Sequence, residues 1–163
     1  MDQLIPVVGT TALLGSALVG GVFFAFSSFV MKALARMPPA EGIGAMQSIN
    51  VVVLNPSFLG AFMGTVVVSL GASGLALAGW DRPSAPFFLG GALFYIVGTF
   101  LVTALGNVPL NDQLAGMSAT DPGTREVWEN YLDRWTMWNH VRTAAAMVAA
   151  LLYTLGLMQN GGT

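Results

Sequence analysis

Four long stretches without a charged side chain constrain this 163-residue sequence more than any other feature. They run from Gln3 to Met31, from Gly42 to Trp80, from Pro83 to Asn111 and from Thr143 to Thr163. A helix of about 20 apolar residues crosses the hydrocarbon core of a bilayer, so each stretch is long enough. Backbone polar groups inside lipid must be satisfied within their own segment, which favours helices. The sequence therefore predicts an all-α integral membrane four-helix bundle, with residues 1–163 forming a single transmembrane domain.

Composition supports this prediction and excludes several classes of function. Hydrophobic residues make up 55% of the chain and charged residues 9%, whereas about a quarter of the residues of a soluble domain are charged. The absence of cysteine excludes disulfides, thiolate catalysis and iron–sulfur clusters. A net charge of −2 without a basic run argues against a nucleic-acid partner.

Prolines and polar clusters divide the chain into elements. The first span is predicted over about residues 4–34, ending before Pro38-Pro39 because a proline disfavours helix in the residue before it. A separate helix over about residues 40–54 precedes the second span and lies at the membrane surface or partly re-enters it. Asn55-Pro56 provides the break. The remaining spans are predicted over about residues 57–79, 85–106 and 138–158.

The polar connection between the third and fourth spans should face water. We expect the third span to end at Asn107-Val-Pro109, where the chain turns. Asp121-Pro122 looks like a helix N-cap followed by proline at the first helical position. A long helix starting there is predicted to continue into the fourth span.

Basic residues near the helix ends predict the orientation, because they favour the cytoplasmic side. Lys32 and Arg36 follow the first span, and Arg125, Arg134 and Arg142 lie before or at the start of the fourth. We therefore expect a bacterial cytoplasmic membrane protein with both termini outside and its polar cluster toward the cytoplasm.

The start of the fourth span carries the least expected polar residues. Asn139, the lone histidine His140 and Arg142 introduce an otherwise apolar segment. At about 100° per residue, Trp135, Trp138 and Arg142 share one helical stripe with Asn139 at its border. His140 lies more than about 100° from the centre of that stripe by the same count, so a pocket centred on Asn139 reaches it only at its edge.

Each of these residues also has an ordinary structural interpretation. Trp135 and Trp138 can anchor the helix at the membrane interface, and Arg142 can extend its guanidinium to the headgroups. An arginine at depth otherwise faces a protein interior or a wet cavity and marks function. His140 can be a hydrogen-bonded interfacial histidine, a proton-transfer group or a metal or haem ligand.

Further polar and aromatic residues converge on the same end of the bundle. Under the topology above, the other helices bring further groups to the half of the membrane that holds Arg142: Tyr95, Thr99, Thr103, Asn107, Asn111, Gln47, Asn50, Asn55 and the first-span residues Phe23, Phe24, Phe26 and Phe29. We favour a functional site for Asn107, Asn111, Asn139 and Arg142 taken together. Gly60-x-x-x-Gly64 instead has the spacing of a helix-packing motif.

Three motifs together resemble a known family. They are PPAEGIGAMQSINVVVLNP, then NVPLN, then WxxYLDRWTMWNHVRT, and they resemble, in order, the anthrone oxygenase-like family of small four-span membrane proteins. Characterised members oxidise anthrones to anthraquinones with O₂ and need no cofactor. The resemblance implies a membrane-embedded oxidoreductase, a monooxygenase, acting on a flat aromatic or lipophilic substrate.

The residues suit such chemistry. An anthrone is flat and weakly acidic, so an enzyme needs an aromatic slot, a base and donors for the developing oxyanion. On this hypothesis Trp135, Trp138, Tyr95, Phe26, Asn50 and Asn55 bind substrate. His140 takes the proton, and Arg142 with Asn107, Asn111 or Asn139 stabilises the enolate. One histidine and no cysteine make a dedicated transition-metal centre unexpected.

Two other functions stay open at this point. One is a non-enzymatic binding protein for a lipophilic ligand such as a quinone, a lipid or haem, with His140 as the axial ligand of the haem. The other is a structural or assembly subunit, which would have no cavity between its helices. Self-association into a homo-oligomer is compatible with each of the three, as is contact with membrane lipid.

Overall fold

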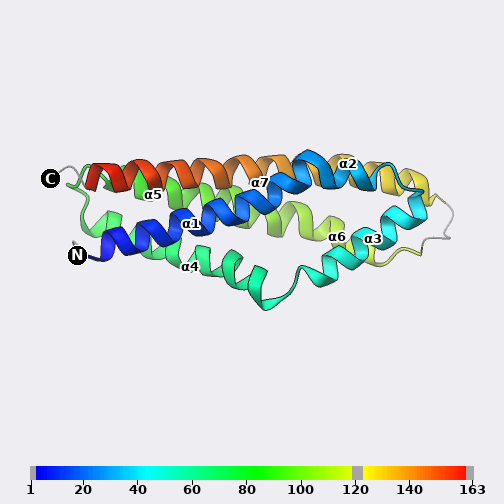
Figure 1. Ribbon diagram of the computed structural model, residues 1–163, viewed down its shortest axis with the longest axis horizontal. Helices are drawn as coiled ribbons and strands as arrows, with labels where there is room; N and C mark the ends of the chain where they lie inside the picture. The colour runs from blue at the N-terminus through cyan, green and yellow to red at the C-terminus, as the bar shows by residue number, and fades with distance from the viewer. Residues whose placement is uncertain (1–2, 119–122, 161–163) are drawn as a thin grey trace.

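The protein, described by a computed structural model over residues 3–118 and 123–160, is all-helical in those residues. Four continuous helical segments are long and apolar enough to cross a membrane: Leu4–Leu34, Pro56–Ala78, Ala85–Ala115 and Thr124–Gln159. In Figure 1 both chain ends and the turn between the second and third segments lie at one end of the molecule. The predicted all-α four-span architecture is confirmed.

The first segment combines α1 (Leu4–Ala25), the π-helical η1 (Phe26–Val30) and α2 (Met31–Leu34). It packs along α7 (Thr124–Asn160), the longest helix. Small residues allow the two helices to approach closely: a Cβ added at Gly20 would lie 3.2 Å from the Cβ of Ala146. In lipid this close packing replaces the hydrophobic drive that holds soluble bundles together.

The helix before the second span is α3 (Pro39–Val52), which starts with a proline in its first turn. Its position is fixed by Gln47, whose side-chain amide nitrogen Nε2 donates to the carbonyls of Leu114 and Met117 at 2.9 and 3.0 Å. Those carbonyls lie at the C-terminal end of a neighbouring helix, where helical partners are lacking. The side chain of Gln47 therefore fastens α3 to the end of the third span.

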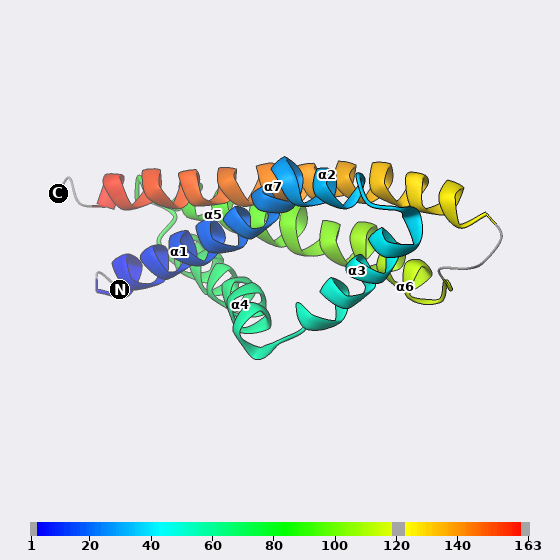
Figure 2. The same ribbon diagram turned by 45° about the vertical axis from the view of Figure 1, so that its right-hand side comes forward.

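A sharp corner separates α3 from α4 (Pro56–Ala78). Asn55 caps α4 by accepting a hydrogen bond from the backbone N–H of Phe58 at 3.0 Å, and its amide donates to Val52. Pro56 at the first helical position completes this start. The predicted break at Asn55-Pro56 is confirmed, and in Figures 1 and 2 the corner stands away from α7.

The third span runs through α5 (Ala85–Leu93), the π-helical η2 (Phe94–Leu101) and η3 (Thr103–Asn107), and α6 (Val108–Ala115). The predicted end at residue 106 and the turn at Asn107-Val-Pro109 are therefore wrong, because the helix continues past Pro109. In a regular helix the ring of proline clashes with the carbonyl four residues earlier. The wider π-helical turn that precedes Pro109 gives the chain room to stay helical.

The long helix that feeds the fourth span is confirmed, and it begins at Thr124. The predicted N-cap at Asp121-Pro122 lies outside the described residues. Gly60 and Gly64, predicted to mediate helix packing, meet no atom within 4 Å of an added Cβ. An added side chain at either position would therefore meet no other helix among the described residues.

Candidate functional site

A cavity of about 570 Å³ lies on the inner side of the α3–α4 corner. Its walls come from α1 and η1, α3, α4, the third span and α7. The aromatic lining consists of Phe23, Phe26, Phe58, Phe62 and Trp135. The polar lining consists of Gln47, Asn50, Thr103, Asn111, Asp112 and Arg142. Its size falls within the range of small-molecule sites, and its mostly apolar lining with a few polar groups is typical of them.

Arg142 supplies a cation to the wall of this cavity. Its side chain is only 5% exposed, so it does not extend to the headgroups. The Cζ atom lies 3.9 Å from the ring centroid of Phe23 and 4.8 Å from that of Trp135. Both rings present π-electron density to the guanidinium, which partly offsets the loss of water around it.

Hydrogen bonds hold the guanidinium in place. Arg142 Nε donates to Oδ1 of Asn139 at 2.9 Å, and Nη1 donates to Oγ1 of Thr103 at 3.4 Å. The amide of Asn139 donates in turn to the carbonyl of Phe23 and to Oγ of Ser27, both at 2.7 Å. These bonds link α1 and η1 to α7, so the position of the guanidinium is set by the packing of the two helices.

No carboxylate pairs with Arg142 among the described residues. The neighbours that bond it, Asn139 and Thr103, are neutral. A cation removed from water without an opposite charge is costly, and in membrane proteins such a residue faces a partner or a wet cavity. The part of the cavity beside Arg142 therefore has the electrostatic character of a site for an anion.

Asn111 organises the wall beside Arg142. Its Oδ1 accepts hydrogen bonds from Tyr131 Oη at 2.9 Å and from Trp135 Nε1 at 2.8 Å. Tyr131 and Trp135 stack with their ring centroids 6.4 Å apart, and Trp135 meets Phe26 at 5.5 Å. The indole plane of Trp135 is therefore fixed from both sides, which suits a rigid slot for a flat ligand.

Two polar lining groups remain available to a ligand. The Nδ2 atom of Asn50 is buried and makes no hydrogen bond of good geometry to the described residues, although its side chain lies close enough to Tyr131 to interact with the hydroxyl. A buried donor without an acceptor costs about 1–3 kcal/mol, so a ligand oxygen that accepts this bond would recover stability. Asp112 supplies the one carboxylate of the lining, and it is exposed at the rim.

The structure brings only some of the predicted site residues to the cavity. Arg142, Asn111, Trp135, Phe26 and Asn50 line it. The predicted site residues that do not line it are His140, Asn107, Asn139, Trp138, Tyr95 and Asn55. Of these, Asn139 still acts on the cavity because it bonds Arg142.

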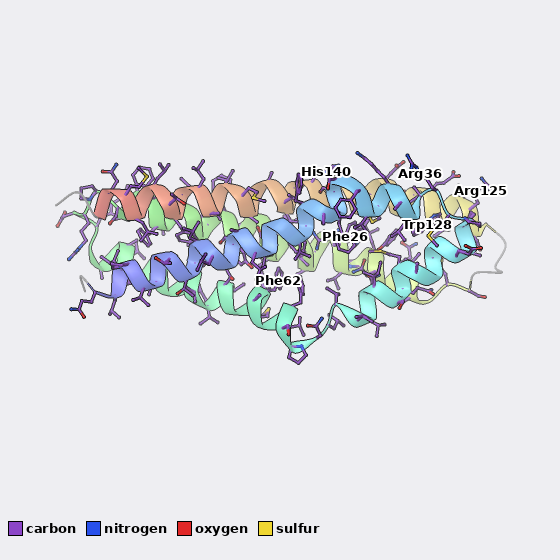
Figure 3. The ribbon with its side chains drawn as sticks, viewed as in Figure 1. Phe26, Arg36, Phe62, Arg125, Trp128 and His140 are labelled. Atoms are coloured by element: carbon purple, nitrogen blue, oxygen red, sulfur yellow. The ribbon has the colours of Figure 1, made fainter. Side chains whose placement is uncertain are left out.

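His140 lies outside the cavity on an exposed face of α7. Its Nδ1 is 2.9 Å from Oγ of Ser27, and Figure 3 shows it at the edge of the bundle away from the α3–α4 corner. The cavity does not reach its ring, so neither the proposed base nor the proposed haem ligand lies in the cavity wall. The angular separation read from the sequence anticipated this placement.

The other four residues have structural partners. Asn107 is buried and donates from Nδ2 to the carbonyl of Trp135 at 3.1 Å, while Tyr95 Oη donates to the carbonyl of Phe62. The ring of Trp138 lies against Gly106, 2.9 Å from where its Cβ would be. Asn55, as described above, caps α4.

Several cavity residues were not predicted. Phe23 is not among them, because the first-span phenylalanines were expected at this end of the bundle, and it lines the cavity one turn before Phe26. Phe58 and Phe62 stack at 5.9 Å on the first turns of α4. Phe58 and Phe62 reach the cavity because the chain turns at Pro56. Asp112 reaches it because the helix continues through Pro109. In the part of the chain that the structure describes, no three acidic or histidine side chains gather closely enough to hold a metal ion.

Comparison with known protein families gives one match. The family model described as anthrone oxygenase matches residues 57–152, which are 96 of the 163 residues. The matched segment includes all of α4 except Pro56, the third span and the part of α7 that carries Asn139 and Arg142. No curated protein and no solved structure matched the chain.

Proposed function

Because the chain belongs to the anthrone oxygenase family, we propose that it oxidises a flat, weakly acidic aromatic molecule of the anthrone type with O₂, and that it binds this molecule as an anion. The observation that carries the proposal is the buried, carboxylate-free guanidinium of Arg142 in the wall of an aromatic cavity. An enolate or phenolate oxygen supplies the missing negative charge, and its fused rings fill the apolar remainder.

The cation also favours the reactive form of such a substrate. A nearby positive charge in a low-dielectric site stabilises an anion far more than it would in water. Loss of a proton from the weakly acidic CH₂ of an anthrone delocalises charge onto the ketone oxygen. Arg142 and Asn50 both line the cavity, and we assign them as the donors that bind that oxygen.

The reaction balances with O₂ as its only co-reactant. The carbanion-like enolate transfers one electron to O₂, and the resulting radical and superoxide combine to form a C–O bond. Protonation gives a hydroperoxide, whose O–O bond breaks as the remaining C–H proton is lost. One anthrone and one O₂ therefore give one anthraquinone and one H₂O.

Asp112 is the side chain we assign to the first proton transfer. It lines the cavity and is exposed at the rim, where a proton can pass on to water. A general base must reach the proton either directly or through one water molecule. His140, in contrast, does not line the cavity, and its Nδ1 lies 2.9 Å from Oγ of Ser27.

The decisive experiment uses the full chain in lipid nanodiscs with anthrone under air. Anthraquinone absorbance and O₂ consumption are followed together, and empty nanodiscs measure spontaneous oxidation. We expect acceleration above that background with one O₂ consumed per anthrone. Arg142→Gln should lower the enzymatic rate by at least about a hundredfold, the loss expected when an oxyanion donor is removed.

The same preparation separates this proposal from the alternatives. A binding protein would take up 1-hydroxypyrene, a flat weak acid whose spectrum reports its ionisation, yet would leave anthrone oxidation at the background rate. An assembly subunit was expected to have solid packing between its helices. The cavity beside Arg142 argues against that alternative.

A further inference from the structure

One side of the cavity mouth is apolar and open. Leu59, Met63 and Val108 line the cavity, yet they are 36%, 45% and 41% exposed. Leu54, at the α3–α4 corner, also lines the cavity and is 65% exposed. These residues come from the corner, the first two turns of α4 and the start of α6. Their exposed surfaces face outward from the bundle rather than toward another helix.

Helix length places this apolar side in lipid. The 23 residues of α4 extend for about 35 Å at 1.5 Å per residue, slightly more than the hydrocarbon core of about 30 Å. With Ala78 at one boundary of the core, Pro56 lies at the other. Leu59 then lies about 5 Å and Met63 about 10 Å below that boundary, among the upper and middle parts of the acyl chains.

Arg142 lies at a similar depth by an independent count. The end of α7 at Asn160 is taken to lie at the same boundary as Ala78. Arg142 stands 18 residues before it, or about 27 Å along the helix axis. The cation is therefore close to the same boundary as the mouth. The polar part of the rim, with Gln47 and Asp112, belongs to segments beyond it, α3 and α6.

We propose that the cavity receives its ligand sideways from the bilayer, through a lateral mouth formed by Leu54, Leu59, Met63 and Val108, and that it selects amphipathic aromatic molecules dissolved in the membrane. This inference rests on the proposed function for the identity of the site. Such molecules lie at the hydrocarbon–headgroup boundary with their rings in the acyl chains and their oxygen toward water, as Trp and Tyr side chains do. They arrive at the mouth already oriented, with the acidic oxygen at the depth of Arg142.

The lateral mouth can be tested by narrowing it. Leu59→Trp adds bulk at its edge, and Leu70→Trp is the matched control, an exposed leucine on the same helix that does not line the cavity. Binding of 1-hydroxypyrene to the full chain in liposomes is followed by stopped-flow fluorescence. We expect Leu59→Trp to slow association and dissociation by about tenfold, equivalent to about 1.4 kcal/mol in the entry barrier, with Kd changed less than about twofold.

Unchanged rates in Leu59→Trp alongside Leu70→Trp would overturn the proposal. A second measurement does not depend on either variant folding. Lipids brominated in the upper acyl chain should quench the fluorescence of 1-hydroxypyrene bound to the wild-type protein more strongly than lipids brominated at the chain end. Equal, weak quenching by both would show that the ligand site is closed to lipid.

These results are independent of turnover. Slowed ligand exchange without anthrone oxidation would leave the lateral mouth standing and remove the proposed oxygenase activity. Anthrone oxidation with exchange rates unaffected by Leu59→Trp would support the proposed oxygenase activity and remove the lateral mouth.

Discussion

Arg142 and Asn139 form one unit: the guanidinium donates from Nε to Oδ1 of the asparagine at 2.9 Å, one turn earlier on α7. The Nδ2 atom of Asn139 is committed to Phe23 and Ser27. The amide can therefore present only its oxygen to the arginine. The direction of the cation in the cavity depends on a residue that does not line the cavity itself.

This coupling predicts non-additive effects on ligand affinity. Asn139→Ala should weaken 1-hydroxypyrene binding by about tenfold, and Arg142→Gln by about a hundredfold. The double variant should bind no more weakly than Arg142→Gln, because both changes remove the same oriented cation. Equilibrium titration of the three variants measures the coupling, and additive losses would show that the two side chains act separately.

Asn50 should contribute to binding at the expense of stability. Its Nδ2 is buried and makes no hydrogen bond of good geometry to the described residues, so Asn50→Leu removes an unsatisfied donor while keeping similar volume. We expect thermal stability to be unchanged or raised by about 1 kcal/mol, while ligand affinity falls by about fivefold. Loss of both affinity and stability would indicate that Asn50 serves the fold instead.

Asp112 and His140 should differ in their effect on turnover. Asp112→Asn removes the proposed proton acceptor, and we expect anthrone oxidation to slow by about a hundredfold. The variant should still bind alizarin, a flat hydroxyanthraquinone that is already ionised in solution and needs no base. His140→Ala should retain turnover to within about twofold, since its ring lies outside the cavity. The opposite ranking of the two variants would restore His140 as the base.

Where helices are in close contact, replacing a glycine should lower the stability of the bundle. A Cβ at Gly98 would lie 2.5 Å from the Cβ of Ala145, so Gly98→Ala should destabilise the bundle by about 1–3 kcal/mol through overpacking. Gly71→Ala is the matched control, since nothing lies within 4 Å of its added Cβ. It should be neutral or slightly stabilising because alanine favours helix. Thermal unfolding in one detergent compares the two, and equal shifts would contradict the close contact.

The fold followed from strong local signals. Charge-free runs and proline positions predicted the four spans and the corner at Asn55-Pro56, because lipid leaves few alternatives to a continuous helix. The predicted end of the third span at residue 106 was wrong, because the helix continues past Pro109. Proline usually ends a helix, and the π-helical turn that accommodates it here leaves no clear mark in residue spacing.

The candidate site was predicted less completely for a related reason. Arg142, Trp135 and Asn111 were found because polar or aromatic residues near lipid are conspicuous. Phe58 and Phe62 look like ordinary lipid-facing residues in the sequence. They line the cavity because the chain turns at Pro56, a tertiary effect that periodicity within one helix does not contain.

The π-helical segments have a consequence for how this protein can change. A π turn accommodates one residue more than an α turn, so everything after it is rotated by about 100° relative to an uninterrupted helix. Deleting a single residue within Thr103–Asn107 could restore a regular helix and swing Asn111 out of the wall that it shares with Trp135. Insertions and deletions at these turns, more than point substitutions, offer a route by which homologues could reshape ligand preference while keeping every span intact.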